Sequence, residues 1–238
     1  MADHEADQFA EPTAGMTVRD LRRRWKPIKE GPAAVEQHPP ICIRLHRCWS
    51  WLQRVEELSE AGIAADDASL IYGWIALNSL YGRWDEQNRE PMSDQRTLDA
   101  FTSRVLEADR DGRIGGLLED QRDLVRSIVG DGYLSKYFWR DPSEDELRRA
   151  KGQARKLGSL YFEKRYAMIL DEVLNRVYLA RCQLVHGAAT YNGGLNREAV
   201  GKTADFLGRF LRAASLVIIE HAWQEDWGGL CYPPSVSG

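Results

Sequence analysis

The chain has 238 residues, 43% hydrophobic and 29% charged, which is the composition of one or two globular domains with an apolar core. A formal net charge of −4 excludes a general attraction to nucleic acid, so any RNA contact needs a local basic patch. Four cysteines without a Cys-x-x-Cys pair or zinc spacing argue against a disulfide frame and a zinc site, and favour free thiols in a reducing compartment.

Membrane insertion is not expected. The longest apolar stretch, residues 213–219, is far shorter than the roughly 20 residues that a spanning helix needs. Residues 1–12 are acidic and polar and lack the hydrophobic segment of a signal peptide. We therefore expect a cytoplasmic protein with no membrane partner.

Residues 1–39 are predicted to form a flexible N-terminal segment. Residues 1–16 have little apolar surface to bury. Residues 17–30 could be a short helix or an arm, and they hold a basic cluster beside Trp25 that consists of Arg22, Arg23, Arg24 and Lys26. Such a cluster is most often a solvated face, with RNA or partner binding as the alternative. Residues 31–40 contain prolines and cannot be helical throughout.

Two strong helix signals follow. In residues 41–61, Leu45, Cys48, Trp49 and Leu52 recur at spacings of three and four, which predicts one buried stripe ending before Gly62. The next helix can be capped by Asp66 or Asp67 and runs to about residue 81. It is apolar on most faces, so we expect it at the centre of the molecule.

The stretch from about 83 to 158 reads as a helical insert. Residues 83–94 are polar and loop-like, and residues 131–141 are aromatic-rich and irregular. The insert is predicted to contain three weakly amphipathic or charged helices, over residues 95–107, 116–129 and 144–156. Gly158 and Ser159 are predicted to break the chain after the third helix.

A long helix over about 160–185 is predicted to end at Gly187, because glycine is common just past a helix end. After a Gly-Asn-rich turn, Asn196 can cap a last helix over about 197–223, and residues 228–238 are expected to be a loose tail. No run of alternating apolar and polar residues argues for a sheet. The predicted fold is all-α, a helical bundle over residues 40–227.

The candidate chemistry lies near the end of the long helix, where Arg181 precedes His186 by five residues. Arginine grips phosphate oxygens with a planar cation, and histidine exchanges protons near neutral pH. Together they could cleave RNA without a metal. His46 and His221 occur singly on helices and are better explained as structural residues, and His4 and His38 fall in loose segments.

A structural alternative exists for the same pair. Positions five apart lie about 140° apart around an ideal helix, so the two side chains share a face only if the last turn is irregular. Arg181 could pair with an acidic neighbour, and His186 could interact with the last carbonyl groups of the helix. On the residues alone we favour this structural alternative.

The motif nevertheless resembles a known signature. Residues 181–187 (RCQLVHG) are similar to the Arg-x4–6-His segment of HEPN domains (higher eukaryotes and prokaryotes nucleotide-binding), and residues 74–82 (WIALNSLYG) are similar to the hydrophobic helix that opens many bacterial members. The resemblance covers roughly residues 41–223. It departs from the pattern at Cys182, where the family often has Asn or Asp.

The resemblance implies an up-and-down helical core with a helical insert, a homodimer, and no metal or cofactor. Many members are endoribonucleases of toxin–antitoxin or phage-defence systems that leave 2′,3′-cyclic phosphate ends. If the roles of the family's motif residues apply to this chain, Arg181 would bind the phosphate and His186 would act as acid and base. Candidate site-lining residues are Cys182, Gln183, Tyr191, Asn192 and Asn78, and candidate RNA contacts are Arg176, Arg197 and Lys202. The alternative is a non-catalytic adaptor that binds a nucleotide or a protein.

Overall fold

The computed structural model of the chain describes residues 15–37, 39–63, 65–188, 190–191, 193–194 and 196–232. The candidate site residue Asn192, together with His4 and His38, lies outside these residues, as do residues 1–14 of the predicted N-terminal segment and the end of the predicted tail.

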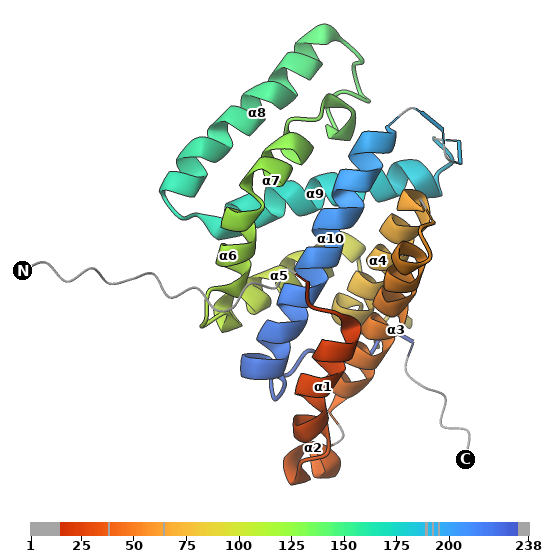
Figure 1. Cartoon of the computed structure of the whole chain (residues 1–238), viewed down its shortest axis with the longest axis vertical. Coiled ribbons are helices and arrows are strands. Elements are labelled where there is room, and N and C mark those ends of the chain that lie inside the picture. The colour runs from red at the N-terminus through yellow and green to blue at the C-terminus, as the bar shows by residue number, and fades with distance from the viewer. Residues whose placement is uncertain are drawn as a thin grey trace, which may run out of the picture.

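The described part of the chain is built from ten α-helices and one short antiparallel hairpin (Figure 1), which confirms the all-α prediction. No helix in it has both the length and the apolar character that crossing a membrane requires. The elements are α1 (Val18–Lys29), α2 (Pro32–Gln37), α3 (Pro40–Glu60), α4 (Asp66–Tyr81), β1 (Trp84–Asp85), β2 (Glu90–Pro91), α5 (Asp94–Ala108), α6 (Arg113–Asp120), α7 (Arg122–Val129), α8 (Glu144–Phe162), α9 (Tyr166–Val185) and α10 (Arg197–Val217), with a π-helical turn (Ile218–Ala222) after α10.

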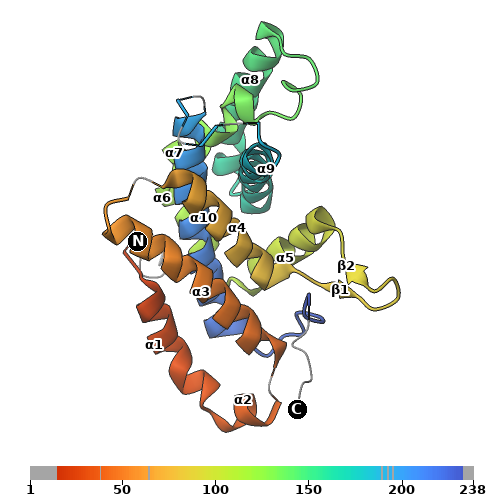
Figure 2. The same cartoon turned by 90° about the vertical axis from the view of Figure 1, so that its right-hand side faces the viewer.

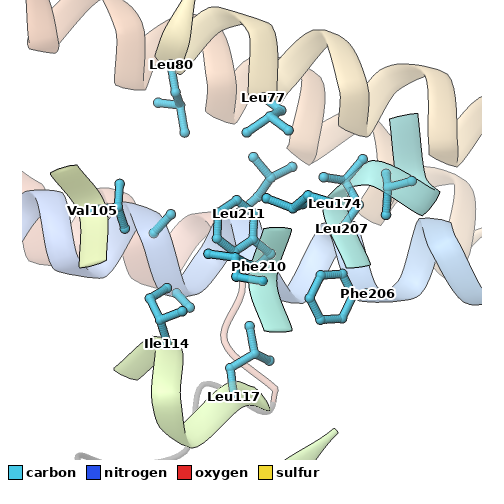
Figure 3. Packing of buried hydrophobic residues seen from close by; sticks show 14 of the residues in the cluster. Leu77, Leu80, Val105, Ile114, Leu117, Leu174, Phe206, Leu207, Phe210 and Leu211 are labelled. Carbon is cyan, nitrogen blue, oxygen red and sulfur yellow. The ribbon is translucent and has the colours of Figure 1, made fainter. Parts of the chain in front are cut away.

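Helix α10 forms the centre of the core (Figure 3). Its Phe206 and Phe210 are fully buried, and its apolar side chains meet residues of α4, α5, α6 and α9. Gly73 of α4 lets the two helices approach closely, since a Cβ there would lie 3.0 Å from Leu207 Cδ2. Truncation of a buried phenylalanine to alanine typically costs about 3–5 kcal/mol, so Phe206 and Phe210 are expected to contribute strongly to the stability of the bundle.

Helix α3 lies against α4 as a helical hairpin, and the short β1–β2 hairpin projects away from the helices (Figure 2). The predicted stripe of α3 is confirmed: Leu45, Cys48 and Leu52 are fully buried. Trp49 of the same stripe donates its indole N–H to Ser215 Oγ of α10 at 3.1 Å, which ties the hairpin to the central helix.

The N-terminal segment is not a flexible arm where it is described. A capping box of Thr17 and Asp20 begins α1, and the helix buries Val18, Leu21 and Trp25 in the main core. The ring of Trp25 contacts that of Trp223 edge-on at 6.3 Å. Of the two sequence alternatives for residues 17–30, a short helix or an arm, the structure has the helix.

The end of the insert also differs from the prediction. Helix α8 begins at the Ser143 cap and runs through Gly158, and the break comes instead at Lys164, whose φ is +52°. A helical glycine costs about 1 kcal/mol. Burial of Leu157 and Tyr161 on one face outweighs that cost, and the Tyr161 hydroxyl also donates to Leu118 O. The predicted helix over 116–129 is two helices, α6 and α7, joined at Gln121.

A buried cation joins α3 to the C-terminal segment, which we define as residues 227–232. The Arg44 guanidinium donates five hydrogen bonds of 2.8–3.3 Å to carbonyl oxygens, two at the end of α4 and three in this segment; the acceptors are Leu80, Gly82, Trp227, Gly228 and Gly229. Burial and the nearby Arg83 lower the pKa of Arg44 to about 10, so the group stays charged at neutral pH. The described part of the tail is therefore held in place, not loose.

The five hydrogen bonds of Arg44, which we call the Arg44 clamp, make this residue important for stability. We expect Arg44→Leu to lower the free energy of unfolding by about 3 kcal/mol, because buried carbonyl groups lose their donors. The matched control is Arg54→Leu on the same helix, whose side chain is exposed and pairs only with Glu57; it should cost less than about 0.5 kcal/mol. Urea unfolding followed by circular dichroism measures both, and equal losses would contradict the clamp.

Candidate functional site

The Arg181–His186 segment forms the last turn of α9. Val173, Val177 and Ala180 bury the inner face of this helix, which fixes its rotation against the core. His186 is the C-cap, Gly187 follows with a φ of +70°, and Ala188 N–H bonds to Gln183 O at 2.8 Å. Only glycine takes that conformation at little cost, so the predicted stop at Gly187 is confirmed.

Arg181 lies between aromatic rings. Its guanidinium carbon is 5.7 Å from the centre of the Trp74 ring and 6.0 Å from that of Tyr178, and its Nη1 is 3.8 Å from Cys182 Sγ. It forms no ion pair with any Asp or Glu that the structure describes. The predicted acidic partner is therefore replaced by aromatic faces, which orient the cation without neutralising it.

The same side chain lines a cavity of about 440 Å³ between α3, α4, α5, α9 and the C-terminal segment. Asn78, a predicted site-lining residue from α4, lines it as well, and its Oδ1 is buried without a hydrogen-bond partner in the described chain. The structure thus brings Arg181 and Asn78 to one cavity. Its volume is within the range of small-ligand sites.

His186 is exposed at the end of α9 and does not line this cavity. Within the described residues, its imidazole makes no hydrogen bond, and none joins it to Arg181. The helix stays regular through Val185, so the expected angle of about 140° between the two side chains is retained. One protomer alone does not bring the two groups into contact.

Cys182 and Tyr178 form a second feature of this turn. A hydrogen bond with the Cys182 side chain raises the pKa of the Tyr178 hydroxyl, and burial raises it further, while Arg181 acts in the opposite direction. The sulfur thus contacts both the cation and a phenol. Cysteine is a weaker hydrogen-bond partner than the Asn or Asp that the resemblance leads one to expect at this place.

Gln183 has a structural role. Its Nε2 donates to Tyr133 O at 2.7 Å, and its Oε1 accepts from Asn196 Nδ2 at 3.0 Å, so it joins α9 to the segment before α8 and to the start of α10. Asn196 begins α10 with a φ of +60° and uses its side chain for this bridge and not as a helix cap. Tyr191 is 85% exposed, and no hydrogen bond or ring contact within the described residues fixes it over Arg181.

The predicted RNA contacts are placed less favourably. Arg176 is only 4% exposed and donates to Leu134 O and Gln153 Oε1, so it lies inside the fold and not on an open surface. Arg197 makes two hydrogen bonds to Asp67, which raise the pKa of the arginine, and Lys202 pairs with Glu198. For Arg197 and Lys202, RNA binding stays a prediction.

Among the described residues, the other histidines and acidic groups do not form a competing site. His221 lies 2.6 Å from Asp111, which fits the structural role expected of it. Asp111, Glu220 and His221 bring potential metal ligands within 4.8 Å of one another, but both oxygens of Glu220 already accept from Arg113 at 2.6 and 2.9 Å. We assign no metal to this group.

Sequence reasoning missed one wall of the cavity. Arg44 and Arg47, one turn apart on α3, line it together with Arg83 and Arg181, which lie far from them along the chain. No short motif contains them, and the only signal was the polar composition of residues 83–94 next to a helix that was expected to be central.

Comparison of the chain with protein-family models, with curated proteins and with solved structures finds no match.

The Gln183 bridge predicts a local effect at the motif. We expect Gln183→Ala to lower the free energy of unfolding by about 1 kcal/mol, because two hydrogen bonds are lost, and to speed hydrogen exchange at residues 184–188. The control is Gln53→Ala on α3, where the amide also makes two hydrogen bonds, with Arg22 and Glu57. Unchanged exchange at the end of α9 in Gln183→Ala would contradict the bridge.

Proposed function

We propose that the protein is a metal-independent endoribonuclease of HEPN type, working as a homodimer through an Arg-x4-His site. The observation that carries the proposal is Arg181: an unneutralised guanidinium, oriented by two aromatic rings, at the wall of a cavity and one turn before an exposed histidine. A structural arginine in a helix normally has an acidic or carbonyl partner, as Arg176 and Arg197 have.

The proposed reaction is an internal transfer at phosphorus. His186 accepts the proton of a ribose 2′-hydroxyl, the 2′-oxygen bonds to the adjacent phosphorus, and the bond from phosphorus to the 5′-oxygen breaks. The leaving oxygen takes up a proton and becomes a 5′-hydroxyl, and the other product ends in a 2′,3′-cyclic phosphate. Arg181 stabilises the negative charge that develops on the phosphate oxygens.

Two protomers are needed because the residues of one protomer do not meet. A twofold axis near the ends of the two α9 helices would set Arg181 of one copy beside His186 of the other. Apolar side chains around this end of α9 support an interface: Val185 is 53% exposed, Trp139 49% and Tyr133 42%. Surfaces of this kind are enriched in protein–protein contacts. By the same resemblance, an antitoxin or a regulatory protein would bind near this site and hold the enzyme inactive.

A non-catalytic adaptor is the second candidate, and one observation favours it. Cys182 replaces the polar residue that the resemblance leads one to expect after the arginine, and it is already engaged with Tyr178. In that case, Arg181 would bind a ligand in the cavity without cleaving RNA.

The first test is cleavage of total RNA in the presence of EDTA. We expect the wild type to cleave and to leave cyclic phosphate ends, and we expect Arg181→Ala and His186→Ala each to lose at least about 100-fold in rate. Arg54→Ala and His46→Ala, both at exposed positions of α3, are the matched controls and should retain full activity. Equal inactivity of the wild type and both variants would favour the adaptor.

A mixing experiment tests whether the site is shared. If Arg181 of one protomer works with His186 of the other, mixed dimers of Arg181→Ala and His186→Ala contain one intact site. About half of the dimers are mixed after exchange, so roughly a quarter of the wild-type activity should return. If each protomer used its own pair, mixing would restore nothing.

A further inference from the structure

The proposed reaction needs a proton donor for the 5′-oxygen that leaves phosphorus. In a displacement at phosphorus, the attacking and leaving oxygens lie roughly in line, on opposite sides of the phosphorus atom. The imidazole of His186 that takes the 2′-proton therefore stands on the wrong side to protonate the 5′-oxygen in the same step. Arg181 cannot supply the proton, because a guanidinium is not deprotonated in proteins. A donor is therefore expected among the other side chains beside Arg181, which holds the phosphate.

Tyr178 lies beside Arg181 on α9. The two residues are three positions apart, so they are neighbours on the surface of the helix, and the guanidinium carbon of Arg181 lies 6.0 Å from the centre of the Tyr178 ring. The Tyr178 ring also contacts the buried Trp74, with ring centroids 5.6 Å apart. The tyrosine is half-buried, so its ring is held in place while part of the side chain stays open to solvent.

The hydroxyl proton of Tyr178 is held only by sulfur. The hydrogen bond with the Cys182 side chain raises the pKa of the phenol, which means that it stabilises the protonated form and that the hydroxyl is the donor. Sulfur is a weak acceptor, so an oxygen of a phosphate ester can displace it. Three other tyrosines donate their hydroxyl protons to oxygen atoms of the protein at 2.9–3.1 Å; they are Tyr81, Tyr161 and Tyr166.

The charge of Arg181 also suits Tyr178 to the role of an acid. The hydrogen bond to Cys182 and burial both raise the pKa of the phenol, so it keeps its proton at neutral pH until the reaction takes it. Arg181 acts in the opposite direction, because a cation stabilises the phenolate. The same guanidinium can therefore stabilise the phosphate charge and the phenolate that remains after the proton has left. Tyrosine is one of the side chains that act as general acids in enzymes.

We propose that Tyr178 is the general acid of the ribonuclease and gives its phenolic proton to the 5′-oxygen as the bond from phosphorus to that oxygen breaks. In the same step His186 takes the proton of the 2′-hydroxyl, so the products are the 5′-hydroxyl, the cyclic phosphate, an imidazolium and a phenolate. Water then removes the proton of the imidazolium and returns one to the phenolate.

This inference rests on the proposed function, and it assigns to Tyr178 the acid role that the family resemblance gives to the histidine. It also gives a role to Cys182, the residue at which the sequence departs from the family pattern. An Asn or Asp at this place would offer an oxygen as acceptor, whereas the weaker sulfur leaves the phenolic proton available to the substrate.

A substrate with sulfur at the leaving position tests the assignment. The linkage that the wild type cuts in a short RNA is mapped first, and the same RNA is then made with sulfur in place of the bridging 5′-oxygen at that linkage. A thiol has a pKa of about 8.5, several units below that of an alcohol, so sulfur leaves as a thiolate without being protonated. Loss of a general acid therefore slows cleavage of the oxygen linkage but not of the sulfur linkage.

Tyr178→Phe removes the hydroxyl and keeps the ring that packs on Trp74. We expect this variant to cleave the oxygen linkage roughly 100-fold more slowly than the wild type, and the sulfur linkage at nearly the wild-type rate. His186→Ala should be slow on both linkages, because the 2′-hydroxyl still needs a base. The matched control is Tyr166→Phe, which also removes a hydrogen-bonded hydroxyl from a half-buried position of α9 and should equal the wild type on both.

Three results overturn the proposal. Equal slowing of Tyr178→Phe on the two linkages would show that the hydroxyl has a structural role only. Full activity of this variant on the oxygen linkage would show that the hydroxyl is not used. Cys182→Ala is expected to cleave both linkages, so a loss confined to the oxygen linkage in this variant, with none in Tyr178→Phe, would assign the acid role to the thiol.

Failure of this assignment is distinguishable from failure of the ribonuclease. Cleavage that needs Arg181 and His186 but is unaffected in Tyr178→Phe overturns the acid role alone. A wild type that cuts no RNA overturns the ribonuclease and the acid role together.

Discussion

The Arg44 guanidinium is the buried charge around which the end of α4 and the C-terminal segment are arranged. Removing such a cation from water costs several kcal/mol unless every donor finds an acceptor, and here the acceptors are carbonyl groups instead of a carboxylate. Carbonyl groups bind the two terminal nitrogens but leave the charge in place, and Nε is buried without a hydrogen-bond partner in the described chain. That arrangement fixes the positions of the end of α4 and of the C-terminal segment. It also accounts for the position of Arg83 over Gly228 and for the basic character of the neighbouring cavity.

The fold class and most helices could be predicted because their signals are local. The stripe of Leu45, Cys48 and Leu52 on α3 and the glycine stop at Gly187 depend only on neighbouring residues. The prediction that the helix breaks at Gly158 was wrong because the burial of Leu157 and Tyr161 outweighs the cost of a helical glycine, about 1 kcal/mol. No local sequence pattern displays that burial. The prediction of a loose tail after residue 227 failed for the same reason, because the contact that holds this segment comes from Arg44, far away in the sequence.

The candidate site could be predicted only in part. Arg181 and His186 stand out because their chemistry and spacing are visible in one helix, whereas the rings that orient Arg181 come from two helices. The burial of Arg176 could not be predicted, because its partners Leu134 and Gln153 lie more than 20 positions away in the sequence. The cavity wall needs residues from four helices and the C-terminal segment, so it exists only after the chain has folded.

The clamp also has a consequence for how the protein is made. Arg44 and the carbonyl group of Trp227 are 183 positions apart in sequence. At a synthesis rate of 5–20 residues per second, roughly 10 to 40 s separate the appearance of the cation from that of its distant acceptors. During that interval water hydrates the Arg44 guanidinium, and its burial is disfavoured because three of its five native acceptors are absent. The contacts around Arg44 are therefore expected to form late, when residues 227–229 have emerged.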